Sequence, residues 1–133
     1  YKKDLKPIAN LKSIISQIHH LKKGDSLGYN RGYIAKQDTT TATIPIGHAD
    51  GIKRQYGKGK GYIVIHNQKA PILGNVCMDM IMVDVTNINC KEGDEVIIFN
   101  AHNTAEDLAE TVQSISYELI TAISQRIKRV FYR

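Results

Sequence analysis

Side chains that could carry out proton transfer occur in four short motifs of this 133-residue chain, and the first contains a tyrosine. Tyr29 lies between glycines in residues 24–33 (GDSLGYNRGY). A tyrosine acts as a general base only when positive charge stabilises its phenolate, because a free phenol has a pKa near ~10. Arg31 would share a strand face with Tyr29, but the local sequence offers no other such charge. Taken alone, the pattern is more typical of a half-buried β residue.

The other motifs are residues 44–51 (IPIGHADG), 74–79 (GNVCMD) and 114–118 (SISYE). Cys77 has no second cysteine or histidine at ligand spacing, and Cys90 lies far along the chain, so no metal site is predicted. A single cysteine in such a run usually packs as a small apolar residue. With only two cysteines and no signal peptide, we expect reduced thiols and a cytoplasmic protein.

The four motifs, in this order over about residues 11–133, resemble the C-terminal domain of the alanine racemases. These are pyridoxal 5'-phosphate enzymes that interconvert L- and D-alanine. The resemblance implies a mainly β, barrel-like domain with one or two short helices near its C-terminus. It also implies that residues 1–133 are one domain of a longer chain, since nothing here resembles the N-terminal α/β barrel that carries the cofactor-binding lysine. The chain begins with Tyr1 rather than methionine, as expected for such a piece.

The resemblance implies catalytic and binding roles for three residues. Tyr29 would remove or return the α-proton on one face of the substrate, while the barrel lysine acts on the other face. The main-chain amide of Met78 would bind the substrate carboxylate, a role that needs no particular side chain. Tyr117 would donate its hydroxyl to the cofactor phosphate. In the head-to-tail homodimer of the family, Tyr29 and Met78 serve the partner subunit's site and Tyr117 serves its own.

The resemblance also implies a substrate corridor that contains His48, Arg54 and Asp79. His48 departs from the family, which usually has tyrosine there, and an imidazole would keep a polar aromatic wall while adding a group that can carry charge. Asn75 departs too, where many members have arginine. Without the resemblance, His48 and Tyr117 are explained as structural residues. For Asp79, a carboxylate that stabilises a turn is as good an explanation as a corridor residue.

Residues 11–21 are open to two interpretations. The spacing of their apolar side chains predicts an amphipathic helix. The resemblance and the β-branched residues favour a strand instead. The apolar residues concerned are Leu11, Ile14, Ile15, Ile18 and Leu21.

From residue 39 to residue 99, β-rich runs alternate with turn residues, which predicts short strands in a barrel or sandwich. The predicted runs cover residues 39–46, 62–65, 81–86 and 95–99, with turns at 49–51 and 67–68. Pro45 and Pro71 lack an N–H, so we expect them at strand ends, edges or bulges.

Two helices are predicted after these strands. Thr104 offers a hydroxyl cap, with acidic Asp107 three residues later, and so predicts the start of one helix. A second short helix is predicted over residues 116–121, followed by a closing strand over 127–132. Residues 123–130 (ISQRIKRV) resemble in particular family members fused behind a peptidoglycan-precursor (Mur) ligase.

The formal charge of +5 and the basic loop at residues 57–61 (GKGKG) suggest a rival hypothesis. With Lys53 and Arg54 nearby, the chain could be a small basic β-barrel that binds nucleic acid. The loop lacks phosphate-loop spacing, however, and no nucleic-acid motif supports this alternative. The racemase hypothesis predicts alanine as substrate, D-alanine for peptidoglycan as product, and neither nucleic acid nor membrane as partner. No apolar run approaches the roughly 20 residues of a membrane helix.

Overall fold

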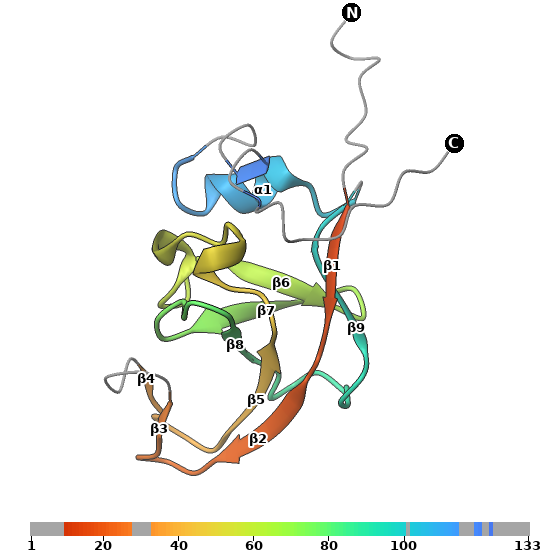
Figure 1. Cartoon of the computed structure of the whole chain (residues 1–133). Helices are drawn as coiled ribbons and strands as arrows, with labels where there is room; N and C mark the ends of the chain where they lie inside the picture. Colours follow the sequence, from red (N-terminus) through yellow and green to blue (C-terminus); the bar gives the residue numbers. More distant parts are fainter. Residues whose placement is uncertain (1–9, 28–32, 101, 115–118, 121–122, 124–133) are drawn as a thin grey trace, which may run out of the picture.

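The computed structural model describes residues 10–27, 33–100, 102–114, 119–120 and 123. Seven β-strands form one sheet, and two shorter strands form a separate hairpin (Figure 1). The elements are β1 Leu11–Ile14, β2 Gln17–Leu21, β3 Ser26–Leu27, β4 Tyr33–Ile34, β5 Thr39–Ile44, η3 His48–Asp50, η4 Arg54–Tyr56, β6 Tyr62–Ile65, β7 Gln68–Leu73, β8 Ile81–Asp84, β9 Glu95–Phe99 and α1 Ala105–Glu110.

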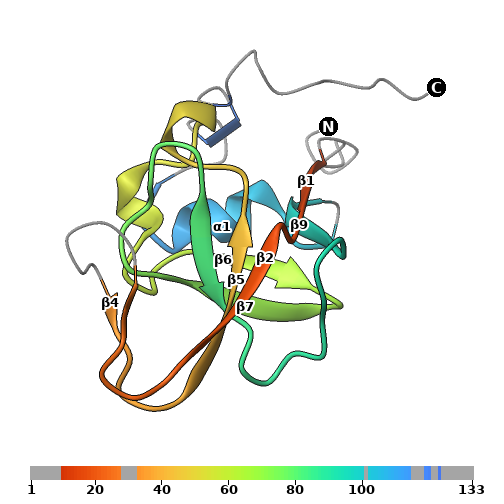
Figure 2. The ribbon, with the colours of Figure 1, turned by 60° about the horizontal axis from the view of Figure 1, so that its bottom comes forward.

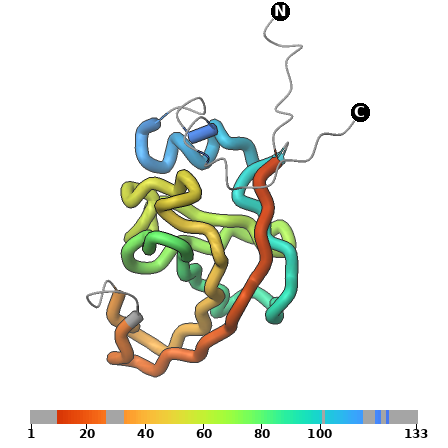
Figure 3. The backbone as a smooth tube through the Cα atoms, in the orientation of Figure 1, coloured from red at the N-terminus to blue at the C-terminus, as the bar shows by residue number. Residues whose placement is uncertain are grey.

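The large sheet curls back toward itself. Its strand order is β1-β9-β6-β7-β8-β5-β2, and all paired neighbours are antiparallel. The two edge strands, β1 and β2, follow each other directly in the chain, separated by Ile15 and Ser16. A single extended segment therefore forms both edges of the sheet, with β1 paired to β9 and β2 paired to β5. The tube in Figure 3 shows this continuous segment. The prediction of a mainly β, barrel-like domain is confirmed.

Residues 11–21 form strands rather than a helix, and the change of partner explains their apolar spacing. The Ile15 N–H donates to the Asp94 carbonyl near β9 (3.0 Å), whereas the next N–H, of Ser16, donates to the Thr43 carbonyl of β5 (2.9 Å). Leu11 and Ile15 are buried before this switch, and Ile18 packs against the core after it. Along one strand, inward-facing residues are two apart, so Leu11 and Ile15 both face inward from odd positions. After the switch an even position, Ile18, faces inward. The resulting steps of four and three residues resemble the spacing of an amphipathic helix.

The interior of the sheet is aliphatic. Figure 2 shows β8, β5 and β2 side by side after a 60° turn of the view. Side chains from all parts of the curled sheet meet inside it and are almost completely shielded from solvent, which provides the main hydrophobic stabilisation. They include Ile15, Ile44, Ile63, Ile65, Ile72, Ile81, Val83, Val96 and Ile98.

The predicted runs correspond to β5, β6, β8 and β9, but β7 was not predicted. Its Pro71 pairs with Tyr62 of β6, while pairing with β8 begins only at the next residue, Ile72. The Ile72 N–H points toward β6 and donates to the Gly61 carbonyl. Because successive residues of a strand point their N–H groups to opposite sides, the nitrogen of Pro71 faces β8, with which it is not paired. The missing N–H of Pro71 therefore costs no hydrogen bond. Pro45 follows the last residue of β5, in agreement with the prediction of a strand end.

The turn between β6 and β7 is one residue earlier than predicted. It contains His66 and Asn67, which have φ values of 49° and 65°. Two consecutive residues with positive φ suit the right-handed twist of a hairpin, and asparagine tolerates this conformation better than most residues.

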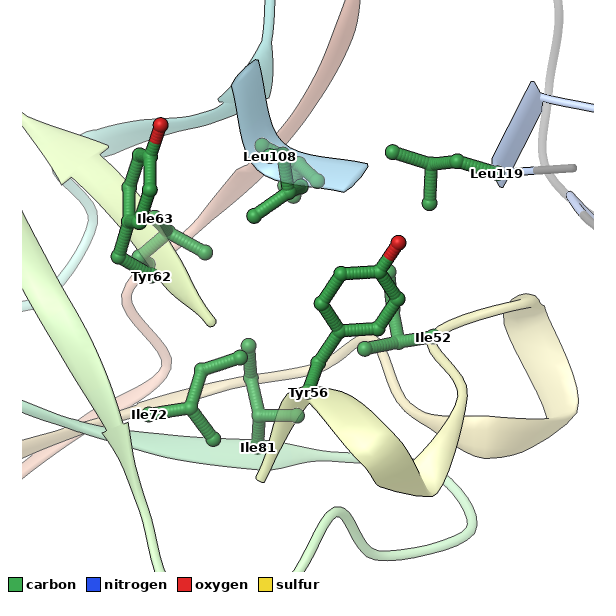
Figure 4. Close-up of a pocket in the computed structure, with 9 residues that line it drawn as sticks. Ile52, Tyr56, Tyr62, Ile63, Ile72, Ile81, Leu108 and Leu119 are labelled. Carbon is green, nitrogen blue, oxygen red and sulfur yellow. The ribbon is translucent and has the colours of Figure 1, made fainter. Parts of the chain in front are cut away.

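Helix α1 confirms the prediction of a helix near the C-terminus. The Thr104 side chain accepts a hydrogen bond from the Asp107 N–H at 3.1 Å. Leu108 of α1 and Leu119 are buried against the core (Figure 4). Of the second predicted helix, Leu119 and Ile120 are described and are helical. Its other residues, and the predicted strand at 127–132, lie outside the described residues.

Candidate functional site

The β6–β7 hairpin has two ends that carry different groups of residues. Residues 47–61 precede β6 and residues 74–80 follow β7, so both segments lie at one end, which we call the loop end. The other end contains the turn at His66 and Asn67 together with residues 90–94, and we call it the turn end. Figure 1 shows the two ends on opposite sides of the hairpin.

A tight turn at residues 47–51 forms the first part of the loop end. Gly47 precedes the 3-10 helix η3, and its N–H donates to the Asp50 carboxylate at 3.0 Å. The Asp50 side chain is buried, with 3% exposure. Gly51 ends η3 at φ 109°, a conformation that favours glycine. The turn is thus closed by a buried carboxylate that bonds to its own backbone.

This turn is joined to residues 77–80 through the backbone. The His48 N–H donates to the Cys77 carbonyl and the Ala49 N–H donates to the Met78 carbonyl, both at 2.8 Å. A Cβ atom on Gly47 would collide with the Cys77 carbonyl oxygen and lie 2.6 Å from the Met80 nitrogen. Position 47 therefore requires glycine for space.

The second loop, which follows η4, packs against the same segment. The Lys58 N–H donates to the Gly74 carbonyl at 2.6 Å, and the Gly59 N–H donates to the Ile72 carbonyl at 2.7 Å. A Cβ on Gly57 would lie 2.7 Å from the Gly74 oxygen, so this position also has no room for a side chain. Backbone contacts on both sides fix residues 74–80.

Four predicted site residues are brought to the loop end, namely His48, Arg54, Met78 and Asp79. All four are exposed, and the Met78 side chain is 55% exposed. The Met78 carbonyl is turned toward Ala49, while its N–H donates to no other residue in the described ranges. Within the described ranges this amide is therefore available for the predicted contact with an anion.

The two predicted tyrosines lie outside the described residues. Tyr29 falls in the chain between β3 and β4, which pair through Leu27 and Tyr33. Tyr117 precedes the buried Leu119 by two residues. Their roles stay predictions.

An apolar cavity lies beneath α1, between Tyr56, Leu108 and Leu119 (Figure 4). It has a volume of about 10 Å³. One water molecule would fill such a space, so alanine or pyridoxal phosphate cannot enter it. Its lining consists of aliphatic side chains and two tyrosine rings, which identifies it as a packing gap in the core.

The turn end contains ionisable groups with displaced pKa values. Asp94 accepts hydrogen bonds from the His66 side chain and the Lys91 N–H, both at 3.0 Å, and these bonds lower its pKa. Burial, and then the Asp94 charge, raise the pKa of the Cys90 thiol. On β6, burial raises the pKa of Tyr62, and the charges of Asp107 and Glu110 add to the effect.

The sequence offers few other chemical features in the described ranges. Both cysteines are free thiols. No group of three or more His, Cys, Asp or Glu side chains is placed to hold a metal ion among the described residues. Across the same ranges, no helix is both long and apolar enough to cross a membrane.

Sequence reasoning missed the residues that build the loop end. Gly47 and Asp50 make only one half of a capping box, because glycine has no side chain to accept the second hydrogen bond, so the sequence signal is weak. Gly57 carried no such signal, because its role depends on a backbone contact with Gly74.

Comparison with known proteins identifies the family. Residues 8–131 match the family described as "Alanine racemase, C-terminal domain". The chain belongs to this family. The predicted resemblance is therefore confirmed at the level of the domain family.

Proteins named alanine racemase are similar over nearly the whole chain. The protein from Clostridium tetani is 40% identical, covering 99% of this chain and 35% of its own length. The protein from Helicobacter pylori strain Shi470 is 39% identical, covering 96% of this chain and 34% of its own. The chain thus spans about a third of the length of these curated relatives. The names give no support to the predicted fusion with a ligase.

Solved structures agree in fold. Alanine racemase from Acinetobacter baumannii matches with a TM-score of 0.85 and 35% identity, over 93% of this chain and 35% of that protein. A racemase structure from Bartonella henselae, described as having covalently bound pyridoxal phosphate, matches with a TM-score of 0.86 and 30% identity. That match covers 92% of this chain and 34% of that protein.

Proposed function

We propose that residues 1–133 are the C-terminal domain of a pyridoxal-phosphate-dependent alanine racemase that makes D-alanine for peptidoglycan. The active protein would be a cytoplasmic head-to-tail homodimer whose N-terminal barrel carries the cofactor. Membership of the family supports this function over a basic barrel that binds nucleic acid. The span of about a third of each relative supports the assignment as one domain of a longer chain.

The described residues fit a cofactor site only as a contributing surface. Their apolar cavity is far too small for the cofactor, but the exposed loop end offers an unused main-chain donor at Met78. Pyridoxal phosphate, when bound, supplies an electron sink for the electrons left by removal of the α-proton. This chain would supply groups that bind the substrate and move its proton.

The main structural support for this proposal is the Met78 amide. Its N–H is free among the described residues, and the loop that holds it is fixed on both sides by backbone hydrogen bonds. An amide held in one orientation can bind a carboxylate without the reorganisation that a flexible donor would require. We assign it to the substrate carboxylate in the partner subunit's site.

Two tyrosines would complete the contribution of this chain. The Tyr29 hydroxyl would hold or release a proton at the α-carbon on one face of the substrate, because racemisation needs a group on each face. The Tyr117 hydroxyl would donate a hydrogen bond to the cofactor phosphate within its own subunit. His48, Arg54 and Asp79, exposed at the loop end, would line the corridor through which alanine enters.

The decisive experiment replaces Tyr29 with phenylalanine in the full-length protein. Tyr29→Phe removes the hydroxyl that would take the proton while keeping the ring. We expect the exchange of the L-alanine α-hydrogen with D₂O, followed by NMR, to fall by at least about a thousandfold, toward the upper range for losing a general base. The cofactor absorption spectrum should be unchanged. Exchange at the wild-type rate would exclude Tyr29 as the base.

The assignment as one domain has its own test. Residues 1–133 expressed alone should neither retain pyridoxal phosphate through gel filtration nor racemise alanine. A measurable racemisation rate from this piece would contradict the need for a second domain.

A further inference from the structure

We propose that Asp50 is a positioning residue for substrate binding, because it holds the turn that orients the Met78 amide. This inference rests on the proposed role of Met78 in binding the substrate carboxylate. Asp50 itself is 3% exposed and would not touch the substrate.

The Met78 amide depends on outside support for its direction. Residues 75–80 belong to no strand, and within them the Cys77 N–H donates to the Met80 carbonyl at 3.1 Å. The Cys77 and Met78 carbonyls also accept backbone hydrogen bonds, from His48 and Ala49. These two bonds join the part of the segment that contains Met78 to the turn at residues 47–51.

One of these bonds sets the direction of the Met78 N–H directly. The Cys77 carbonyl and the Met78 N–H belong to the same peptide unit, which is planar and trans, so the two groups point in opposite directions. When the His48 N–H holds the Cys77 oxygen at 2.8 Å, the Met78 N–H must point away from the turn. The bond from Ala49 to the Met78 carbonyl, also 2.8 Å, restrains the following peptide unit.

The two donors are held in place by Asp50. The N–H groups of His48 and Ala49 are the first of η3 and have no partner inside that short helix. Their direction follows from the conformation of Gly47, whose own N–H donates to the Asp50 carboxylate at 3.0 Å. Gly47 is buried, so loss of the carboxylate would leave a buried donor unpaired and favour rearrangement of the turn. A glycine at position 47 has no Cβ to restrict such a rearrangement.

The proposed role requires a side-chain oxygen at position 50 but not its charge. Two substitutions of Asp50 can therefore be compared, one that keeps the oxygen and one that removes it. Asp50→Asn keeps a side-chain oxygen that can accept from Gly47, whereas Asp50→Ala removes it. Asp94→Ala is the control, since Asp94 also accepts a backbone N–H, that of Lys91 at 3.0 Å, but at the turn end. All three variants should be made in the full-length protein.

We expect Asp50→Ala to raise the KM for alanine about tenfold or more, with a smaller change in kcat, because a misaligned amide loses substrate binding. Asp50→Asn should restore most of the affinity. Asp94→Ala should leave KM within about twofold of wild type. An unchanged KM for Asp50→Ala would overturn the proposal, as would equal KM increases for Asp50→Ala and Asp94→Ala.

Hydrogen exchange followed by mass spectrometry provides a readout that does not depend on activity. In Asp50→Ala, amides in residues 45–52 and 74–81 should exchange at least about tenfold faster than in wild type, since both segments share the broken network. Asp50→Asn should exchange nearly as wild type. Faster exchange confined to residues 45–52 would refute the link to Met78. If full-length wild type fails to racemise alanine, the proposed function is refuted, and the substrate role of Asp50 is refuted with it. This holds even if hydrogen exchange shows that residues 45–52 and 74–81 are coupled.

Discussion

The loop end and the turn end of the β6–β7 hairpin are both closed by hydrogen bonds, but by different kinds of atoms. At the loop end, backbone N–H groups of residues 47–61 donate to backbone carbonyls of residues 72–78. At the turn end, the side chains of His66 and Asp94 form the link, and the His66 side chain is 50% exposed. Backbone pairing at close approach gives little freedom, which suits a surface that must present an amide in one direction.

The glycines of the two ends show the same difference. Gly47 has a φ of −151°, which any residue can adopt, yet it has no room for a Cβ. Gly93, next to Asp94, has open space around it but a φ of 92°. The loop end needs glycine for packing, and the turn end needs it for backbone conformation.

The largest effect is expected from Gly47→Ala. The added methyl group would meet the Cys77 and Met78 carbonyl oxygens and the Met80 nitrogen, all backbone atoms that cannot rotate away. We expect the free energy of unfolding to fall by roughly 3 kcal/mol, at the upper end for overpacking, as measured by urea denaturation. Activity of the full-length protein should fall as well. If Gly47→Ala lowered the free energy of unfolding by less than Gly93→Ala does, the distinction between the two ends would be contradicted.

A smaller loss is expected from Gly93→Ala. The methyl group finds no atom within 4 Å, so the cost comes only from placing alanine at positive φ. That cost is about 1 to 2 kcal/mol, measurable in the same urea experiment. Because the turn end lies away from the loop end, the KM for alanine should stay at the wild-type value. An increase in KM would show that the two ends are coupled.

The smallest effect is expected from Asp94→Asn and depends on pH. Hydrogen bonds from His66 and Lys91 lower the pKa of Asp94 in the folded protein. A carboxyl group of this kind stabilises the fold above its unfolded pKa, about 3.9, and loses that contribution as pH falls through its folded pKa. The Tm difference between wild type and Asp94→Asn should therefore be largest near about pH 6 and shrink toward about pH 2.

Glu95→Gln provides a control for this pH experiment. Glu95 lies 3.7 Å from the Lys12 ammonium, and both side chains are more than half exposed. An exposed pair of this kind contributes little to stability, so its removal should leave the Tm profile almost unchanged. An equal flattening of both profiles would attribute the effect to net charge rather than to the bonds of Asp94.

Elements whose determining interactions are local were predictable from the sequence. The Thr104 cap bonds to an N–H three residues later, and β6 occupies the predicted residues 62–65. Residues 11–21 were ambiguous because their apolar spacing records a change of strand partner between Ile15 and Ser16. Strand β7 was missed because Pro71 is tolerated only where pairing passes from β6 to β8.

The candidate site divides in the same way. The motifs that contain His48 and Met78 were recognisable in the sequence, whereas the closing of the turn by Asp50 was not. Their contact was not, because the two segments lie about thirty residues apart and meet through main-chain atoms that every residue possesses. No side-chain pattern marks such a pairing.

By itself, the amino-acid sequence determined a β-rich domain, the capped helix, the strand end at Pro45, and the family. Only the tertiary structure decided that η3 donates to the Cys77 and Met78 carbonyls and so turns the Met78 amide outward. The physical reason is that hydrogen bonds within a few residues are set by local side chains. Bonds between distant backbone segments are set by how the whole sheet curls.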